Sequence, residues 1–274
     1  MTDVQLVSMA LDIRKKILVM SLRSDSASHL GGGLSLVEIL TCLYGKVMNY
    51  KRDDPLWISR DRFILSKGHG VLGYFAALNY VGIISDSALD TFMEDGSSLI
   101  AHPILNLELG IESSNGSLGQ GLSFGAGMAK AAKMKNSNQS VFVLMGDGEC
   151  NEGSVWEAAQ VSTQLALDNL VAIIDANGLQ SDGEVADGGS PEQLKSKFQS
   201  FGWNSVLVDG HDISALMHEL TKPRKPNQPL CIVARTTKGK GVSFMENNNA
   251  WHHARLTKTN FELAMTELSK LDYE

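Results

Sequence analysis

Small and acidic residues follow an apolar run near the middle of the chain, in a pattern suited to binding phosphate. The run Val141–Met145 leads into Gly146-Asp147-Gly148 and then Glu149. Glycines where a strand meets a helix let a phosphate approach the backbone amides and the helix N-terminus. A bare carboxylate would repel a diphosphate, so Asp147 implies a divalent cation between the two.

A second group of oxygen ligands follows the next apolar run, Leu170–Ile174. The segment Asp175–Gln180 contains Asn177 and a glycine turn. If both runs are neighbouring strands, Asp147 and Asn177 face one ion, and a turn carbonyl, two diphosphate oxygens and water complete an octahedral site for Mg²⁺ or Ca²⁺. Either segment alone is equally explained as a tight turn; their joint occurrence favours a metal–diphosphate site.

Two other phosphate-binding motifs fit this sequence poorly. After Gly146 and Gly148 the next glycine is Gly153, which breaks the dinucleotide-binding spacing G-x-G-x-x-G. The sequence also contains no G-x-x-x-x-G-K-[ST] motif. NAD and nucleoside triphosphates are therefore poor candidates for the ligand.

Four histidines lie beside small or loop-forming residues, where core histidines are rarely found. One such histidine is a surface residue as often as a functional one, but four together indicate a polar cavity that binds phosphate and hydroxyl oxygens and moves protons near neutral pH. They are His29, His69, His102 and His252. We interpret the other three, His211, His218 and His253, as structural.

Two further loops are candidates for ligand contact. Ser113–Gly121 is rich in small residues and precedes a helix, so its backbone can approach a flat ligand or a neighbouring helix. Lys238 and Lys240 lie in a glycine turn, where they either face an anion or are simply solvated.

The elements that position these residues alternate between short apolar runs and helical periodicity, which is typical of βαβ units. The predicted buried parallel strands are Phe63–Leu65, Val141–Met145, Leu170–Ile174, Ser205–Val208 and Leu230–Ala234. Predicted helices include Val4–Leu22, Gly119–Lys135, Gly153–Leu165 and Ile213–Thr221, and one that opens at Ser35 with Glu38 completing a capping box.

This order of elements predicts a single α/β domain over residues 1–274. We expect a doubly wound, mostly parallel sheet with helices on both faces. Ligands of such sheets bind beyond the carboxyl ends of the strands. The loops after Met145, Ile174 and Ala234 are therefore the expected site.

Composition restricts the location and the partners of the chain. With 24 Lys and Arg against 31 Asp and Glu, the formal charge is -7, and no basic run with interleaved aromatics suggests nucleic acid. The three cysteines show no metal-ligand or redox spacing, and no long apolar stretch suggests a membrane segment or signal peptide. These features predict a cytoplasmic protein.

The motifs taken together resemble the amino-terminal, thiamine diphosphate-binding part of transketolases. Gly146-Asp147-Gly148, followed at this spacing by a strand that ends at Asn177, is similar to the cofactor motif of that family. Four more segments occur in the family in the same order: Arg60–His69, Gly116–Gly121, Asp209–Asp212 and Thr236–Gly241. Ser28 and Ser117 depart from the family pattern, where Gly and Pro are common, without removing a functional side chain.

This resemblance implies roles for individual residues. Asp147, Asn177 and the Leu179 carbonyl would hold the metal, and the Gly148 amide, His69 and His252 the diphosphate, with Gly146 and Glu149 in the same cofactor motif. Gly116 and Leu118 would meet the aminopyrimidine through their backbones. His29, His102 and His252 would contact sugar hydroxyls and transfer protons. Glu152 either joins a network across a subunit interface or is an acid favoured by the helix dipole.

The resemblance also implies a partner, because the family's next domain supplies a glutamate that activates the cofactor and basic residues that grip the sugar phosphate. We expect a separate carboxy-terminal subunit, an α2β2 assembly, and transfer of a two-carbon unit from a ketose phosphate to an aldose phosphate. The alternatives are half of a 1-deoxyxylulose phosphate synthase-like or 2-oxo acid dehydrogenase-like enzyme, or a non-catalytic cofactor-binding protein.

Overall fold

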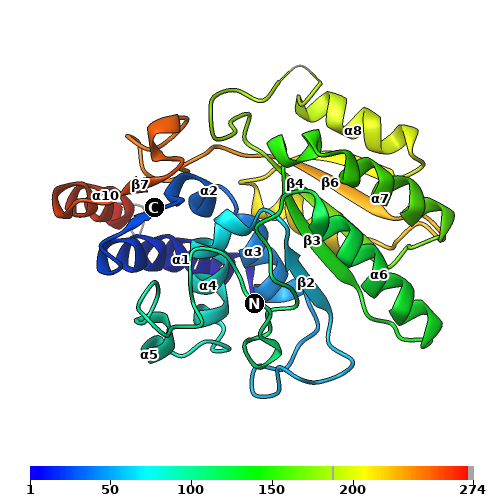
Figure 1. Cartoon of the computed structure of the whole chain (residues 1–274), viewed down its shortest axis with the longest axis horizontal. Coiled ribbons are helices and arrows are strands. Elements are labelled where there is room, and N and C mark those ends of the chain that lie inside the picture. Colours follow the sequence, from blue (N-terminus) through cyan, green and yellow to red (C-terminus); the bar gives the residue numbers. More distant parts are fainter. Residues whose placement is uncertain (187, 271–274) are drawn as a thin grey trace.

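A five-stranded parallel sheet forms the centre of the protein (Figure 1). The computed structural model describes residues 1–186 and 188–270. In spatial order the strands are β2 (Arg62–Leu65), β3 (Val141–Gly146), β4 (Leu170–Ala176), β6 (Leu230–Arg235) and β5 (Asn204–Asp209). All five predicted strands are confirmed. A separate antiparallel pair joins β1 (Ala27–Ser28) to β7 (Ala254–Arg255).

Helices cover both faces of the sheet, which confirms the doubly wound α/β fold. One face carries α1 (Asp3–Arg23), α3 (Val37–Cys42), α4 (Val71–Tyr80) and α9 (Ile213–Thr221). The other carries α6 (Gln120–Met134), α7 (Gly153–Gln164) and α8 (Pro191–Ser200). The remaining α-helices are α2 (Leu30–Leu34), α5 (Asp86–Leu89) and α10 (Lys258–Lys270), which packs on α1.

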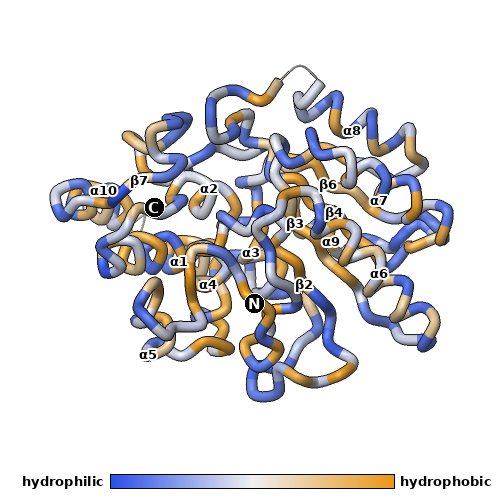
Figure 2. Tube along the Cα trace, in the orientation of Figure 1, coloured by the Kyte–Doolittle hydropathy of each residue, from blue (hydrophilic) through white to orange (hydrophobic). Residues whose placement is uncertain are grey.

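Alternation along the strands separates two hydrophobic cores. Phe142 and Leu144 point to the core under α1, α3 and α4, whereas Val143 and Met145 point to the core under α6 and α7. This is the period of two expected of a strand buried on both faces. Figure 2 shows the apolar sheet enclosed by helices whose outer surfaces are hydrophilic.

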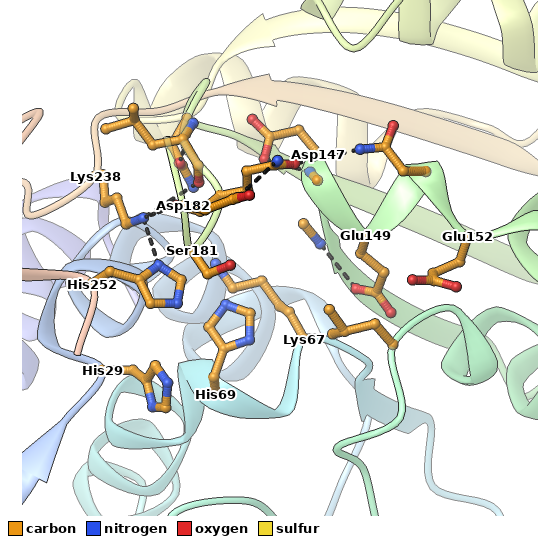
Figure 3. A pocket seen from close by; sticks show the side chains of 18 of the residues that line it. His29, Lys67, His69, Asp147, Glu149, Glu152, Ser181, Asp182, Lys238 and His252 are labelled. Atoms are coloured by element: carbon orange, nitrogen blue, oxygen red, sulfur yellow. Dashed lines mark hydrogen bonds between the residues drawn. The ribbon is translucent and has the colours of Figure 1, made fainter. Parts of the chain in front are cut away.

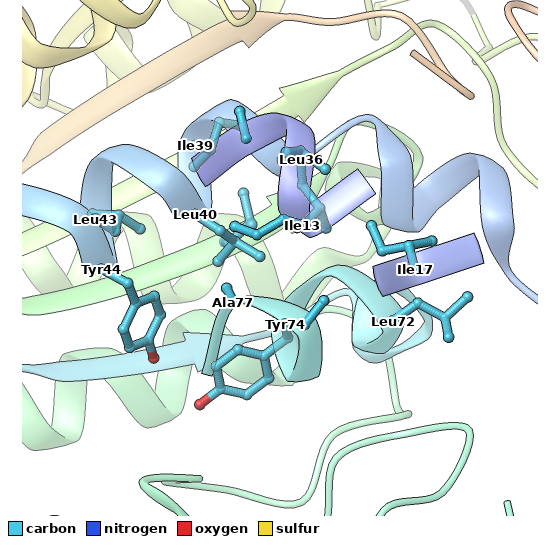
Figure 4. Packing of buried hydrophobic residues seen from close by; sticks show 14 of the residues in the cluster. Ile13, Ile17, Leu36, Ile39, Leu40, Leu43, Tyr44, Leu72, Tyr74 and Ala77 are labelled. Carbon is cyan, nitrogen blue, oxygen red and sulfur yellow. The ribbon is translucent and has the colours of Figure 1, made fainter. Parts of the chain in front are cut away.

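The helix predicted for Val4–Leu22 is confirmed as α1, and it supplies one wall of the larger core. Thr2 caps it through a reciprocal pair of hydrogen bonds with Gln5. Its apolar stripe includes Ile13 and Ile17, both fully buried, which meet α3 and α4 (Figure 4). The core therefore fixes the helices that precede the first two candidate histidine loops.

The capping box predicted at Ser35 and Glu38 is wrong. The chain is already helical from Leu30, and α3 begins after Leu36, which makes no side-chain cap. Ser35 instead donates its hydroxyl to Asp175 at 2.5 Å. Glu38 accepts hydrogen bonds from Arg14 and His211, so both side chains form long-range contacts and neither is available for the local cap.

The stretch Leu30–Val47 is long and apolar enough to pass a test for a membrane-spanning helix, with a mean hydropathy of 1.3. In the protein 83% of that window is buried. The stretch is also divided between α2, α3 and a π-helical turn, Leu43–Val47. Its apolarity therefore serves the core beneath the sheet.

Strand register brings the candidate loops to one edge. Gly146 at the end of β3 pairs with Asp175 in β4, and Asp175 pairs with Ala234 in β6. Because these strands are parallel and level, the segments that follow them leave the sheet side by side. The short helical turns Gly68–Gly70 and Gly148–Asn151 begin there.

Candidate functional site

A cavity of about 380 Å³ opens where these segments leave the sheet. Residues from widely separated parts of the chain line it, as Figure 3 shows for its labelled side chains. Every candidate site residue from the sequence lies in this lining: His29, His69, His102, Gly116, Leu118, Gly146, Asp147, Gly148, Glu149, Glu152, Asn177, Leu179 and His252. The sequence therefore identified residues that share one cavity, although this placement does not assign their roles.

Asp147 is the most constrained of the candidate metal ligands. Its carboxylate is nearly inaccessible to solvent and accepts the amides of Gly148 at 2.8 Å and Gly178 at 2.6 Å. Burial, followed by repulsion from Asp175, raises the pKa of Asp147 to about 6. A buried carboxylate whose charge is disfavoured in this way is a good ligand for a divalent cation, which would compensate that charge.

Asn177 and Leu179 lie beside Asp147 and add neutral oxygen atoms. The amide of Asn177 donates to Asp175 at 3.1 Å, and its oxygen accepts the Leu179 amide at 3.1 Å. Within residues 1–186 and 188–270, no group of three His, Cys, Asp or Glu side chains is arranged to hold a metal. One carboxylate with amide and carbonyl oxygens suits Mg²⁺ or Ca²⁺ that takes its remaining ligands from a diphosphate.

The space near these oxygens also fits a phosphate group. A side chain on Gly148 would come within 3.0 Å of Gln180, so only glycine leaves that backbone amide open. Two buried lysines, Lys67 and Lys238, line the same cavity. Together they provide the local positive charge that an acidic chain needs to bind an anion.

Asp175, which the sequence analysis grouped with Asn177, is the centre of a buried hydrogen-bond network. It is fully buried and accepts Nζ of Lys67 at 2.5 Å. Ser35, Thr236 and Asn177 also donate to it. Burial raises the pKa of Asp175, but Lys67 and the other donors outweigh burial and hold it below its usual value. We call Lys67, Asp147, Asp175 and Asn177 the cavity floor.

Glu149 joins three loops beside the floor. Its carboxylate accepts hydrogen bonds from the Ser66 hydroxyl, the Gly119 amide at 2.8 Å and the Gly146 amide at 3.1 Å. Gly119 has φ of 82°, and a side chain there would lie 2.6 Å from Glu152. Both oxygens of Glu149 are thus engaged by the protein, and the glycines of this loop allow close packing.

Lys238 lies deep in the cavity, although a lysine in a glycine turn is often solvated. It is 1% exposed, and Nζ lies 2.7 Å from Nδ1 of His252 and 2.9 Å from Oδ1 of Asn249. Burial and the nearby charge of Lys67 lower the pKa of Lys238 to about 8. Figure 3 shows its side chain extending over His252.

Five imidazoles cluster on the opposite side of the cavity. The ring centroid of His29 lies 5.4 Å from that of His69, 5.9 Å from His102, 5.3 Å from His252 and 4.5 Å from His253. We call these five residues the histidine wall. The sequence analysis missed His253, because a second histidine directly after His252 gave no separate signal.

Four wall histidines are held neutral at physiological pH. Burial is the largest cause throughout: it lowers the pKa of His69 to about 2, of His29 to about 3 and of His252 to about 4. The pKa of His102 is lowered as well, by burial and then by His253. Neutral imidazoles each offer one donor and one acceptor, which suits hydroxyl groups and proton exchange.

The remaining predicted residues occupy the rim of the cavity. Glu152 is exposed, and Figure 3 shows its carboxylate at the edge of the cavity near Glu149. Gly116 and Leu118 are exposed as well, and Gly116 lies against the ring of His102. Of the histidines interpreted as structural, His211 contacts Glu38 and Thr237 away from the cavity.

Comparison with known proteins places this geometry in a family. The family model described as "Transketolase, thiamine diphosphate binding domain" matches residues 9–270. One of the two subunits of an apulose-4-phosphate transketolase from Phocaeicola vulgatus is 40% identical over 98% of this chain and 95% of its own length. A 6-deoxy-6-sulfo-D-fructose transketolase subunit from a Clostridium species is 35% identical over 94% of each chain.

A solved structure agrees with these sequence matches. Transketolase from Campylobacter jejuni superposes with a TM-score of 0.87 at 25% identity, covering 98% of this chain. The match spans 43% of the Campylobacter chain, so it concerns one part of that larger enzyme. The chain belongs to the transketolase family, as its thiamine diphosphate binding domain.

Proposed function

We propose that the chain is the amino-terminal subunit of a split transketolase. With a separate carboxy-terminal subunit it transfers a two-carbon glycolaldehyde unit from a ketose phosphate to an aldose phosphate. The observation that supports this best is the shared cavity, in which an oxygen-ligand floor faces a wall of neutral histidines. The floor suits a metal–diphosphate group and the wall suits a hydroxylated carbon chain.

On the floor, we assign Asp147, the amide oxygen of Asn177 and the carbonyl of Leu179 to a Mg²⁺ ion, or to Ca²⁺. The ion neutralises the buried carboxylate and accepts diphosphate oxygens. The Gly148 amide and His69 donate to the same diphosphate. Asn177 must turn its amide oxygen to the ion, which requires it to leave the Leu179 amide that it accepts in the structure.

Beside the diphosphate, the exposed backbones of Gly116 and Leu118 meet the aminopyrimidine ring. Gly146 and Glu149 support this part of the site from below, since the Glu149 carboxylate holds the Gly119 and Gly146 amides. Thiamine diphosphate, when bound, supplies the electron sink for cleaving the carbon–carbon bond of the ketose.

On the wall, His29, His102 and His252 contact the sugar hydroxyls. Their pKa values are lowered, so the rings exchange donor and acceptor roles with hydroxyl groups without carrying a permanent charge. We assign proton transfer at the ketose to this group, together with His69. A 2-oxo acid offers fewer hydroxyl groups to such a wall, which makes a 2-oxo acid dehydrogenase-like function the weaker alternative.

The partner subunit is proposed from the relatives, which are named as single subunits of transketolases and align over nearly their whole length. Glu152, exposed at the rim, is our candidate for a contact with it in an α2β2 assembly. We expect one domain, activity only with the partner, and a cytoplasmic role in carbohydrate metabolism, including the pentose phosphates. The three cysteines are free and buried, consistent with a reducing compartment.

The test is a transfer assay with the chain and its candidate partner purified separately and then mixed. Donors should include a linear ketose phosphate, apulose 4-phosphate and 6-deoxy-6-sulfofructose, because the relatives' names cover the last two. We expect cofactor-dependent formation of an extended ketose only in the mixture. Activity with pyruvate as the donor, and none with ketoses, would instead support the 1-deoxyxylulose phosphate synthase-like alternative.

Cofactor binding without turnover by any tested combination would favour a non-catalytic binding protein. The decisive control is a partner preparation without this chain, which must be inactive if the cofactor site lies here. Partner alone with full activity contradicts the proposal.

A further inference from the structure

Two consecutive residues after β6 each contact a ring nitrogen of a different histidine. The backbone amide of Thr237 donates to Nε2 of His211 at 2.8 Å, and Nζ of Lys238 lies 2.7 Å from Nδ1 of His252. A peptide N–H is only a donor, so Nε2 of His211 must be the acceptor. His211 therefore carries its proton on Nδ1, where Glu38 accepts it at 2.9 Å.

The surroundings of Lys238 decide the direction of the second bond. Its other neighbours are all acceptors: Oδ1 of Asn249 at 2.9 Å, the Gln180 carbonyl at 3.2 Å and the Leu179 carbonyl at 3.4 Å. The Asn249 amide donates its own N–H to Ser181, which fixes its oxygen toward Lys238.

An ammonium group has three N–H donors and no acceptor. One N–H of Lys238 serves Asn249, one is shared by the two carbonyls, and the third points to Nδ1 of His252 at the shortest distance of the four. Nδ1 of His252 is then the acceptor.

The opposite nitrogen of His252 is consequently the protonated one. Burial and the charge of Lys238 lower the pKa of His252 to about 4, so the ring is neutral and carries a single proton. Figure 3 shows this second nitrogen turned away from Lys238, toward His29 and His69. In the part of the chain that the structure describes, no group accepts a hydrogen bond from it.

We infer that Lys238 is a positioning residue that fixes His252 as an Nε2–H donor directed into the cavity. His252 then recognises an oxygen atom of the ligand, whether a phosphate or a hydroxyl oxygen, and does not serve as the base that takes a proton. The identity of the ligand rests on the proposed function, but the tautomer is a property of the chain without ligand. Among the wall histidines, proton acceptance falls to the others.

The test measures the tautomer directly by two-dimensional NMR of the full chain labelled with ¹⁵N-histidine, at neutral pH and without cofactor. His252→Gln and His211→Gln identify the two sets of signals. We expect opposite patterns: a proton on Nε2 of His252 and on Nδ1 of His211. A proton on Nδ1 of His252, or a mixture of both forms in the wild-type chain, overturns the inference.

Variants then test whether Lys238 sets the tautomer. Lys238→Met should convert the single His252 form into a mixture, and Lys238→Arg, which keeps a donor-only group, should retain it. Lys240→Met is the matched control, because Lys240 lies in the same turn but pairs with Glu246 at 3.5 Å near the surface. Its spectrum should be unchanged.

An unchanged His252 pattern in folded Lys238→Met would overturn the role of Lys238. Thermal unfolding of each variant establishes that it is folded, and the wild-type spectrum with Lys238→Arg decides the question if the Met variant does not fold. Because no cofactor is present, these results are independent of whether the proposed function is correct. Loss of cofactor binding in calorimetry would refute that function and leave the tautomer result intact.

Discussion

The two sides of the cavity are built differently. On the floor, Asp175 alone accepts hydrogen bonds from Lys67 and three other side chains, and parallel register fixes its position. On the wall, the rings of His29, His69 and His102 make no hydrogen bond to any residue in 1–186 or 188–270. A rigid floor suits an unvarying cofactor, and a wall of unpaired rings suits sugars of different length and branching.

The largest expected effect is on stability, from breaking the floor. Lys67→Met leaves Asp175 buried without its cation, and we expect the free energy of unfolding to fall by about 3–5 kcal/mol. Chemical denaturation of the chain without cofactor measures this. Lys133→Met is the matched control: Lys133 pairs with Asp168 at 2.7 Å, both partly exposed, and its loss should cost less than about 1 kcal/mol. Equal losses in the two variants would contradict a special role for the floor.

The next effect is on ligand binding without loss of stability. Asp147→Asn removes the carboxylate proposed to hold the metal, and we expect the affinity for thiamine diphosphate with Mg²⁺ to fall roughly 100-fold, equivalent to about 3 kcal/mol. Its unfolding temperature without ligand should stay level or rise, because burial already disfavours the Asp147 charge, as its raised pKa shows. Unaltered affinity would remove Asp147 from the metal site.

Breaking the wall should change turnover while leaving cofactor binding intact. In the assembled enzyme, His29→Asn should lower kcat about 10- to 100-fold, since it removes a ring proposed to exchange protons with the ketose. Thiamine diphosphate affinity should remain within a factor of about two, well below one kcal/mol. His218→Gln, on a side chain that is 75% exposed, serves as the control and should be fully active. A variant at His29 that loses cofactor affinity as well would merge the two regions.

A smaller effect concerns pH and belongs to the wall. Burial lowers the pKa of His69 to about 2, below the value of about 6.5 for a free imidazole. The unfolded chain therefore binds the proton more strongly, so this contribution to stability is full above about pH 6.5 and is lost as pH falls. We expect Tm to drop between pH 7 and pH 5, and to drop less in His69→Asn. Identical pH dependence in both proteins would show that His69 is not the cause.

Much of the fold was predictable because burial leaves a direct mark on the sequence. The runs Val141–Met145 and Leu170–Ile174 are apolar throughout, as strands covered on both faces must be, and both are confirmed. The position of Asp147 and Asn177 followed from the rule that parallel strands end at one edge. The structure places both in the same cavity.

What could not be predicted depends on contacts between distant segments. Lys67 and Lys238 are buried lysines, and no local pattern distinguishes them from the more exposed Lys240. Ser35 had the sequence of a helix cap, yet its hydroxyl bonds to Asp175, which lies 140 residues further along the chain. Such partners become visible only once the sheet register is known.

Isothermal titration of the purified chain with thiamine diphosphate tests the central claim most directly, with Mg²⁺ or with EDTA, and with and without the partner subunit. The account predicts saturable binding that requires the divalent metal and is strengthened by the partner. Absence of binding with both metal and partner present would contradict the cofactor assignment and the roles proposed for the cavity floor.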